Sequence, residues 1–419
     1  MTYSRVAFRP MRGVALLTQA QAAERLEHSV NVRVGIAWGL LFFNTLTFVP
    51  HTSFLPIPGA VGKGVAQATL PAALLVILTI NRKVVVRPNV FLCLVSLLVV
   101  GTILTVLAPQ TFGQVYRTAR MAGFVAGLWM LTPWWGRRDL LLVRCYLAAL
   151  CVSIGSVLLG LVVSPHHALV SGRLTGAVWP IPPTQVAHYA ALAVGLVVVL
   201  WFCGHIRGRT TLIAVGVGGA VLILTHTRTA LAALIASLLV AGLSLIVAKP
   251  RVRRLFAAAG AVAAVAVMTF SAAITTWLAR GENTQGLDNL TGRTGVWGPL
   301  LSAPRDKFQE IFGFGLSNAS FNGFPIDSNW MSSYQQEGLY GVVICAMILV
   351  FMLVTAYFQP RGVRRALALF LITYCLVASF TEDGFTDVSP YLLDLTLAAS
   401  LCVPSLESGG PDMRDGAMR

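Results

Sequence analysis

The run TALAALIASLLVAGLSLIV, residues 229–247, decides the fold class, because it carries no charge and is long enough to cross a bilayer as a helix. It is preceded by LTHTR, residues 224–228, so that Arg228 stands directly before the apolar run. Similar runs recur along the chain, which is 56% hydrophobic and only 11% charged, far less charged than an ordinary soluble domain. The sequence therefore predicts a protein that crosses a membrane several times.

The apolar runs predict helices rather than a barrel. Backbone amides inside lipid can bond only to one another, and the runs lack the alternation of apolar and polar residues that barrel strands show. We expect an all-α polytopic membrane protein with about twelve transmembrane helices. The predicted spans are residues 34–50, 66–80, 90–108, 121–135, 140–163, 185–203, 210–225, 229–248, 255–274, 338–358, 366–380 and 390–404.

The distribution of Lys and Arg gives the orientation. Most of the 31 basic residues fall in connections that face the cytoplasm if the N-terminus does. We therefore expect residues 1–33 to be a cytoplasmic segment without a cleaved signal, in which residues 14–26 could form a helix on the membrane surface. Residues 34–404 form a single transmembrane domain, and residues 405–419 a cytoplasmic tail. The net charge of +15 is spread over short loops, which suits topology better than nucleic-acid binding.

One connection, residues 275–336, is far longer than the others and falls on the outside. Loops of this length tend to be functional or disordered. This loop contains enough aromatic residues to fold over the bundle, so we expect a large extracytoplasmic lid or active-site segment. These aromatic residues are Trp277, Trp297, Phe308, Phe312, Phe314, Phe321, Phe324 and Trp330.

Neither a disulfide framework nor a metal site is expected. All seven cysteines fall in predicted spans and form no C-x-x-C pair, so they are interpreted as small packing residues. His166 and His167 have no third ligand at suitable spacing, and the outside acidic residues include no D-x-D pair. The sequence predicts no cofactor.

Arg228 allows two interpretations. An arginine at the end of a span can extend its side chain to the lipid phosphates. It can also present a rigid fork of donors to an anionic ligand, and a phosphate suits a guanidinium particularly well. Two further outside stretches place an arginine among Gly, Pro and aromatic residues, and a third stretch rich in Gly and aromatic residues follows them. This company favours the second interpretation. The three stretches are SGRLTGAVWPIPPTQVAHYA at 171–190, LTGRTGVWGPLLSAPRDKF at 290–308 and FGFGLSNASFNGFPIDSNWMSSYQQEGLYG at 312–341.

Together with HTRTAL, these segments resemble the signature segments of the O-antigen ligase and polymerase superfamily, which are bacterial membrane glycosyltransferases. The resemblance covers roughly residues 170–345 in order and spacing: R-x-T-G with prolines, an S-R-T-A-L-like turn, G-R-x-x-x-W, G-x-G and E-x-G-x-x-G. It implies transfer of a glycan from a polyprenyl diphosphate to a glycan or lipid-linked acceptor, without a metal, at the outer face of the bacterial plasma membrane. The implied partners are this donor, the acceptor and membrane lipids, and not nucleic acid.

The resemblance also implies site residues. Growing charge on the diphosphate needs positive groups, and arginines can replace a metal there. Arg228 and Arg293 are expected to hold the diphosphate, with Arg173 in a secondary role and Arg117 and Arg120 as partners. His226 and Trp297 are expected to contact the substrate.

Asp327 is the candidate catalytic base for the acceptor hydroxyl. A carboxylate sheltered by Phe324 and Trp330 would be a stronger base than one in water. The alternative is that Asp327 caps the helix expected from about Ser328. Where ligases commonly have His before Asn, this chain has Asp327 and Ser328, with Asn329 one place later. This departure resembles the polymerases, and the choice between ligase and polymerase stays open.

A different class of protein, a twelve-span transporter or flippase of a lipid-linked sugar, is the alternative. Transporters place polar groups near the middle of the membrane between broken helices. Here the arginines are expected at the outer ends of the spans and beneath one large loop. The sequence therefore favours the enzyme.

Overall fold

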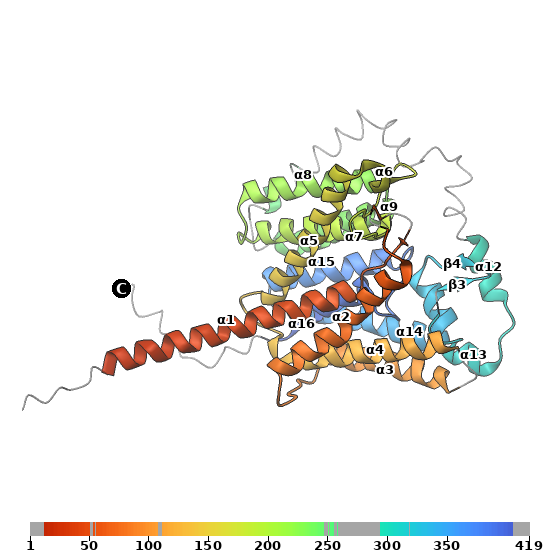
Figure 1. The fold of residues 1–419 in the computed structure, drawn as a ribbon, viewed down its shortest axis with the longest axis horizontal. Helices are drawn as coiled ribbons and strands as arrows, with labels where there is room; N and C mark the ends of the chain where they lie inside the picture. The colour runs from red at the N-terminus through yellow and green to blue at the C-terminus, as the bar shows by residue number, and fades with distance from the viewer. Residues whose placement is uncertain are drawn as a thin grey trace, which may run out of the picture.

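A computed structural model describes residues 12–50, 53–54, 56–107, 111–246, 250, 252–254, 258, 294–317 and 319–404. The structure is 74% helical, and within the described residues the only strands form two short antiparallel hairpins. Figure 1 shows the helices gathered into one bundle, with α1 projecting from one end. The expectation of an all-α architecture is met at this level.

The predicted spans fall on helices, except for residues 255–274, which lie almost wholly outside the described residues. The long helices are α1 (Arg12–Asn44), α2 (Gly59–Ile80), α3 (Val90–Val106), α4 (Phe112–Leu131), α5 (Leu141–Val163), α7 (Pro183–Phe202), α8 (Gly208–Thr225), α9 (Arg228–Ile246), α14 (Asn329–Phe358), α15 (Val363–Ala378) and α16 (Pro390–Cys402). The short elements are η2 (Thr132–Trp134), α6 (Pro165–Ala168), α12 (Thr294–Ser302), α13 (Lys307–Phe312), and the hairpins of β1 (Leu169–Val170) with β2 (Arg173–Leu174) and β3 (Ser320–Phe321) with β4 (Phe324–Pro325).

Six helices of the described chain are long and apolar enough to cross a membrane, namely α2, α5, α7, α8, α9 and α14. Helices α3 and α16 are apolar but shorter. Exposed Leu, Val and Ile side chains are numerous on these helices, for example Leu212 at 75% and Val162 at 80% exposure. Such surfaces suit contact with lipid rather than water.

Helices α7, α15 and α16 form the centre of the bundle (Figure 1). In α7, 83% of the apolar window is buried within the protein, compared with 28% in α5 and in α8. A helix that is buried on nearly all faces must be apolar all round, and these three are so except at a few positions. The polar side chains on the central helices therefore need an explanation.

Two of the central helices are too short to cross a hydrocarbon core of about 30 Å. At 1.5 Å per residue, the 16 residues of α15 span about 24 Å and the 13 residues of α16 about 20 Å. The connection between them, residues 379–389, lies beside the first residue of the longer α14, because the Asn329 amide donates to the Ser379 carbonyl at 2.9 Å and the Phe385 amide donates to the Asn329 side-chain oxygen at 2.8 Å.

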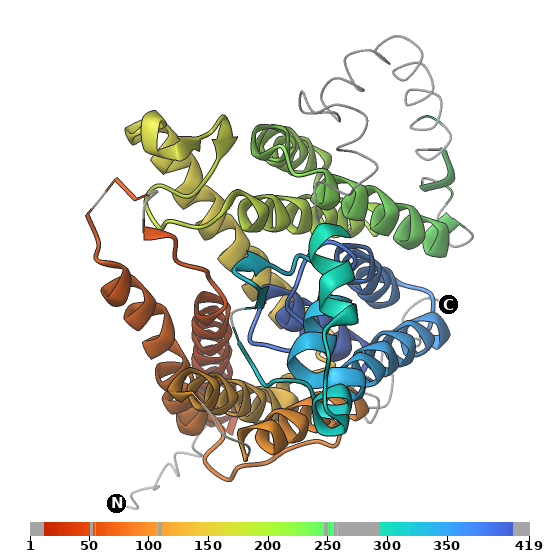
Figure 2. The same ribbon diagram turned by 90° about the vertical axis from the view of Figure 1, so that its right-hand side faces the viewer.

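The described part of the large loop, α12, α13 and the β3–β4 hairpin, lies over one end of the bundle, as Figures 1 and 2 show. Arg305 fixes it to α14 by donating to the Tyr334 carbonyl at 3.1 Å and to the Gln335 amide oxygen at 2.7 Å. The guanidinium also lies 4.2 Å from the ring centre of Tyr334. We define the site end as this end of the bundle.

The helix α14 is broken at Gly338, whose φ of 64° and ψ of −158° are open only to glycine. The break receives the chain after α13, where Phe314 and Gly315 donate backbone hydrogen bonds to Gln335 and Gln336 at 3.0 and 2.8 Å. A Cβ at Gly338 would lie 2.5 Å from the Ile311 carbonyl. The glycines of the G-x-G and E-x-G-x-x-G segments therefore allow two backbones to meet.

Candidate functional site

The site end contains a polar pocket with a volume of about 210 Å³. It forms where the chain after α1, the start of α7 and the connection 379–389 meet. Three carboxylates and one imidazole stand among its lining groups. The lining residues are Thr45, Thr47, Pro182, Thr184, Gln185, His188, Glu382, Asp383, Gly384, Asp387, Val388, Ser389, Pro390 and Tyr391.

Residues 379–389 are held in place from several sides. Thr381 donates to the Thr229 hydroxyl at 2.9 Å, and the Phe385 amide donates to the Asn329 side-chain oxygen at 2.8 Å. At the far end Ser389 caps α16 by accepting from the Leu392 amide at 3.1 Å and also donates to the Gly384 carbonyl. These bonds fix the pocket carboxylates relative to α9, α14 and α16.

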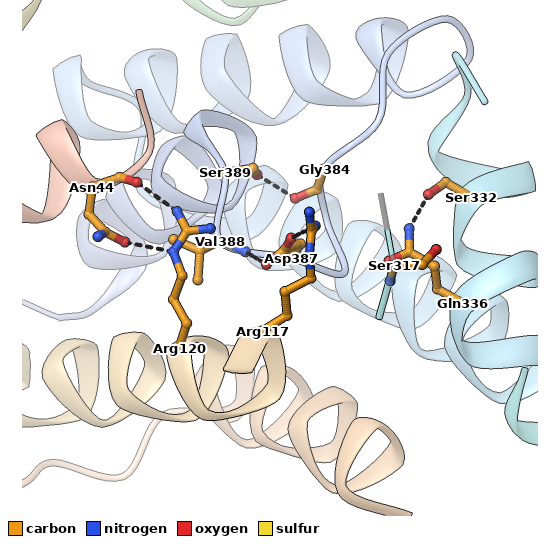
Figure 3. Close-up of polar contacts among 10 residues, drawn as sticks. All are labelled: Asn44, Arg117, Arg120, Ser317, Ser332, Gln336, Gly384, Asp387, Val388 and Ser389. Carbon is orange, nitrogen blue, oxygen red and sulfur yellow. Dashed lines mark hydrogen bonds and ion pairs between the residues drawn. The ribbon is translucent and has the colours of Figure 1, made fainter. Parts of the chain in front are cut away.

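Two arginines of α4 reach this region, as Figure 3 shows. Arg117 forms an ion pair with Asp387 at 3.1 Å. Arg120 donates to the carbonyl and side-chain oxygens of Asn44, at the end of α1, at 2.6 and 3.2 Å. Both guanidinium groups thus lie beside groups that line or adjoin the pocket.

Arg173 and Arg228 adjoin the opposite flank of residues 379–389. Arg173, in β2, donates to the Thr225 carbonyl at 3.0 Å and to the Thr227 hydroxyl at 3.3 Å, and so clasps the turn that leads into α9. Burial lowers the pKa of Arg173, while the negative charge of Glu382 acts in the opposite direction. Arg228 is the first residue of α9, one residue before the Thr229 that Thr381 contacts, and its Nε and Nη2 atoms are buried.

The structure thus gathers Arg117, Arg120, Arg173 and Arg228 around one connection, although none of them lines the pocket itself. His226 lies in the turn beside Arg173, in a left-handed conformation with φ 51°. Arg293 lies outside the described residues. Trp297 belongs to α12, which packs on α14, and it does not line the pocket.

Asp327 lies near the pocket but does not line it. Its negative charge acts on Asp383, a lining residue. The N-cap of α14 is Ser328, one residue after Asp327. Phe324, the first residue of β4, is 64% exposed, and the ring centre of Trp330 lies 6.3 Å from that of Phe380. The shelter of Asp327 by these two rings stays a prediction.

The acidic residues of the pocket were not among the predicted site residues. Burial raises the pKa of Asp383 to about 7, with a further rise from the negative Asp387 and Asp327. Ser332 and Arg117 act in the opposite direction, Ser332 through a hydrogen bond. The hydroxyl of Ser332 in turn accepts from Gln336 at 2.5 Å, and the Gln336 oxygen accepts from the Ser317 amide at 3.3 Å (Figure 3).

A sequence signal for these residues did exist. The stretch TEDGFTD, residues 381–387, holds three of the 16 acidic residues of the chain between two apolar spans. Acidic residues in such a position are costly in lipid and are functional candidates for that reason. In the sequence analysis, the outside acidic residues were considered only as metal ligands, and the missing D-x-D pair argued against that role.

Below the pocket, three buried polar groups of different helices meet. His188 of α7 lies 3.0 Å from Asp394 of α16 (Nε2 to Oδ2), and the Tyr146 hydroxyl of α5 donates to the other oxygen of Asp394. Their side chains are at most 2% exposed. Within the described part of the chain, no group of three or more His, Cys, Asp or Glu residues could hold a metal ion.

Comparison with known proteins adds no relative. No protein-family model matches the chain, and no curated protein matches it significantly. The site must therefore be interpreted from its own chemistry.

Proposed function

We propose that the protein is a metal-independent inverting glycosyltransferase of the O-antigen ligase and polymerase type. It moves a glycan from polyprenyl diphosphate to a glycan or a lipid-linked acceptor. We place the site end at the extracytoplasmic face of a bacterial plasma membrane, with twelve spans and both chain ends in the cytoplasm.

The observation that carries the proposal is the gathering of arginines from separate segments. Arg117 and Arg120 come from α4, Arg173 from β2 and Arg228 from α9, and all adjoin residues 379–389 or groups beside them. Snorkelling to lipid does not require arginines of distant segments to meet beside one pocket. A diphosphate, which carries several negative oxygens, suits such a set.

The chemistry then needs two things from the protein. The polyprenyl diphosphate leaves the anomeric carbon with the bonding electron pair, and fixed guanidinium groups stabilise the growing charge. The acceptor hydroxyl must also lose its proton to a base. Asp327 remains a sequence-based candidate for this base, and Asp383 joins it because it lines the pocket.

The arginine mechanism is tested by turnover of a synthetic polyprenyl-diphosphate glycan by purified protein in EDTA. Substituting Arg228→Ala or Arg173→Ala should reduce kcat/KM by about one to two orders of magnitude, because a charge-assisted hydrogen bond contributes about 1.5–3 kcal/mol. Arg228→Lys should recover only part of the loss, since an ammonium lacks the planar fork.

Arg209→Ala is the matched control. Arg209 is exposed in the first turn of α8, at the opposite end of the helix whose last residue accepts from Arg173. This variant should keep normal turnover. Normal rates in both Arg228→Ala and Arg173→Ala, or a strict need for a divalent ion, would contradict the mechanism.

The alternative function, transport of a lipid-linked sugar, draws support from the break in α14 at Gly338 and from the short α15 and α16, because transporters use discontinuous helices around a buried site. Proteoliposomes distinguish the two functions. A transporter moves a fluorescent lipid-linked glycan across the bilayer without breaking the bond to diphosphate, whereas the proposed enzyme releases the diphosphate.

A further inference from the structure

Three side chains of three helices form a continuous polar chain beneath the pocket. The Tyr146 hydroxyl donates to one oxygen of Asp394, and the other oxygen lies 3.0 Å from Nε2 of His188. Asp394 is fully buried and His188 is 2% exposed. The imidazole is therefore held by a carboxylate whose own orientation is fixed by a phenol.

Only His188 of these three side chains lines the pocket. Nε2 lies 3.0 Å from Oδ2 of Asp394, close enough for an ion pair although not aligned as a hydrogen bond, and Nδ1 is buried without a hydrogen-bond partner among the described residues. The ring packs against the tilted rings of Tyr391, 4.4 Å away, and Tyr374, 5.3 Å away, measured between ring centres. The imidazole thus has a fixed position and one unused nitrogen at the pocket.

Packing alone does not account for this arrangement. Burying a carboxylate and an imidazole costs several kcal/mol, and apolar side chains of similar volume usually fill such a space at no loss of stability. Intramembrane Asp and His residues mark functional sites by default. A carboxylate that accepts N–H from one imidazole nitrogen leaves the other as a proton acceptor, as in hydrolase triads.

Among the described residues, the side chains that line the pocket or face His188 from neighbouring helices are acidic or neutral. No Lys or Arg lines the pocket. The titratable groups facing this region are Tyr146 of α5, Tyr189 of α7, Tyr374 and Cys375 of α15, Tyr391 and Asp394 of α16, and Glu382, Asp383 and Asp387 of the connection.

We propose that His188 is the catalytic base of the transfer reaction and that Asp394 and Tyr146 are its positioning residues. This inference rests on the proposed function. The acceptor O–H bond breaks and its proton moves to Nδ1 of His188. The oxygen bonds to the anomeric carbon, and the bond from that carbon to the diphosphate breaks with its electron pair on the diphosphate. The imidazolium, stabilised by Asp394, then releases its proton to water in the pocket.

His188 suits this role better than the carboxylates of the connection. Asp387 is already engaged in the ion pair with Arg117, and Asp383 accepts from Ser332. Within the described residues, Nδ1 of His188 has no hydrogen-bond partner, so this nitrogen is left to accept a proton from the acceptor hydroxyl.

The test is the single-turnover rate of full-length protein with a synthetic polyprenyl-diphosphate glycan and acceptor, from pH 5 to pH 9. Wild-type protein should show a rate that rises with pH over one ionisation and then levels off. His188→Gln should lower the plateau by about 10²–10⁴-fold and remove this rise. Binding of a non-cleavable phosphonate analogue of the donor should stay within about twofold of wild type.

The single-turnover rates of Asp394→Asn and Tyr146→Phe are the second measurement. They test the inference even if the His188 variant does not fold. Asp394→Asn should lower the rate at least tenfold, because an amide no longer fixes the tautomer of the imidazole, and Tyr146→Phe should lower it less. His167→Gln is the control, since His167 is exposed on α6 at the same end and its imidazole Nδ1 lies 2.8 Å from the Ser164 hydroxyl, away from the pocket lining.

A His188→Gln protein with the wild-type pH profile would overturn the inference, whether its rate is normal or lowered in parallel with donor binding. If His188→Gln does not fold, a normal rate and pH profile in Asp394→Asn has the same meaning. Wild-type protein that does not cleave the donor at all would instead refute the proposed function.

Discussion

The charged and polar side chains at the site end cost free energy to bury, and most of them offset this cost by pairing with one another. Arg117 pairs with Asp387, Arg173 lies within the field of Glu382, and Asp394 accepts from Tyr146 and faces His188. Glu337 is different, because it is fully buried and its two oxygens have no hydrogen-bond partner among the described residues. Gly341 makes room for it, since a Cβ there would lie 2.9 Å from Oε2 of Glu337.

Asp383 should make stability depend on pH. Its pKa is raised to about 7, so the folded protein keeps a proton between pH about 4 and 7 that the unfolded chain has released. The free energy of unfolding therefore falls across this window and levels off above it. Asp383→Asn should lose this decline and at pH 8 exceed wild type by on the order of 2 kcal/mol, about half the full linkage value because the side chain is partly exposed.

Denaturant unfolding of both proteins in detergent at pH 4.5, 6 and 8 measures this difference. Asp306→Asn is the comparison, since Asp306 is an exposed helix cap bonded to the Gln309 amide at 2.7 Å; it should lower stability without changing the slope between pH 6 and 8. A parallel decline in wild type and Asp383→Asn would show that Asp383 titrates normally.

At the scale of elements, the broken helix α14 joins the large loop to the bundle. Gly313, with φ 74°, lies against the backbone of Gln336, and Gly338 lies against Ile311. The same break ends the polar first part of α14, which carries Asn329, Ser332 and Gln336, before the apolar part begins. One pair of glycines therefore fixes both the loop and the polar side chains that hold residues 379–389.

Gly338→Ala should destabilise the protein by about 3 kcal/mol or more, because the new Cβ meets backbone atoms at 2.5 Å and the φ of 64° is strained for alanine. Thermal unfolding in detergent measures the loss. Gly216→Ala in α8, where a Cβ meets nothing within 4 Å, should instead stabilise by up to about 1 kcal/mol. Equal effects of the two substitutions would contradict this account of the break.

At the scale of the whole molecule, the elements that carry Arg117, Arg173 and Arg228 reach the site end, where the loop elements also lie (Figures 1 and 2). Arg209 lies in the first turn of α8, and Arg361 lies between α14 and α15. The distribution of basic residues predicts that Arg209 and Arg361 face the cytoplasm. The proposed twelve spans require the site end to face away from the cytoplasm.

Labelling of single cysteines tests this arrangement. In a protein whose native cysteines are replaced, His166→Cys and Asn322→Cys should react with a membrane-impermeant maleimide added to intact spheroplasts, because both positions are exposed at the site end. Arg209→Cys and Arg361→Cys should react only after permeabilisation. Labelling of Arg209→Cys and Asn322→Cys from the same side would reject the topology.

The sequence by itself determined the helical class and the positions of most helices, because lipid forces continuous apolar runs into helices whatever their neighbours are. Arg228 is conspicuous beside an apolar run, and the family resemblance singles out Arg173, with Arg117 and Arg120 as partners. Only the tertiary structure decided which polar residues share a pocket. His188, Asp383 and Asp394 lie far apart in the chain or within apolar runs, and their proximity depends on how α7, α15 and α16 pack, which no local pattern encodes.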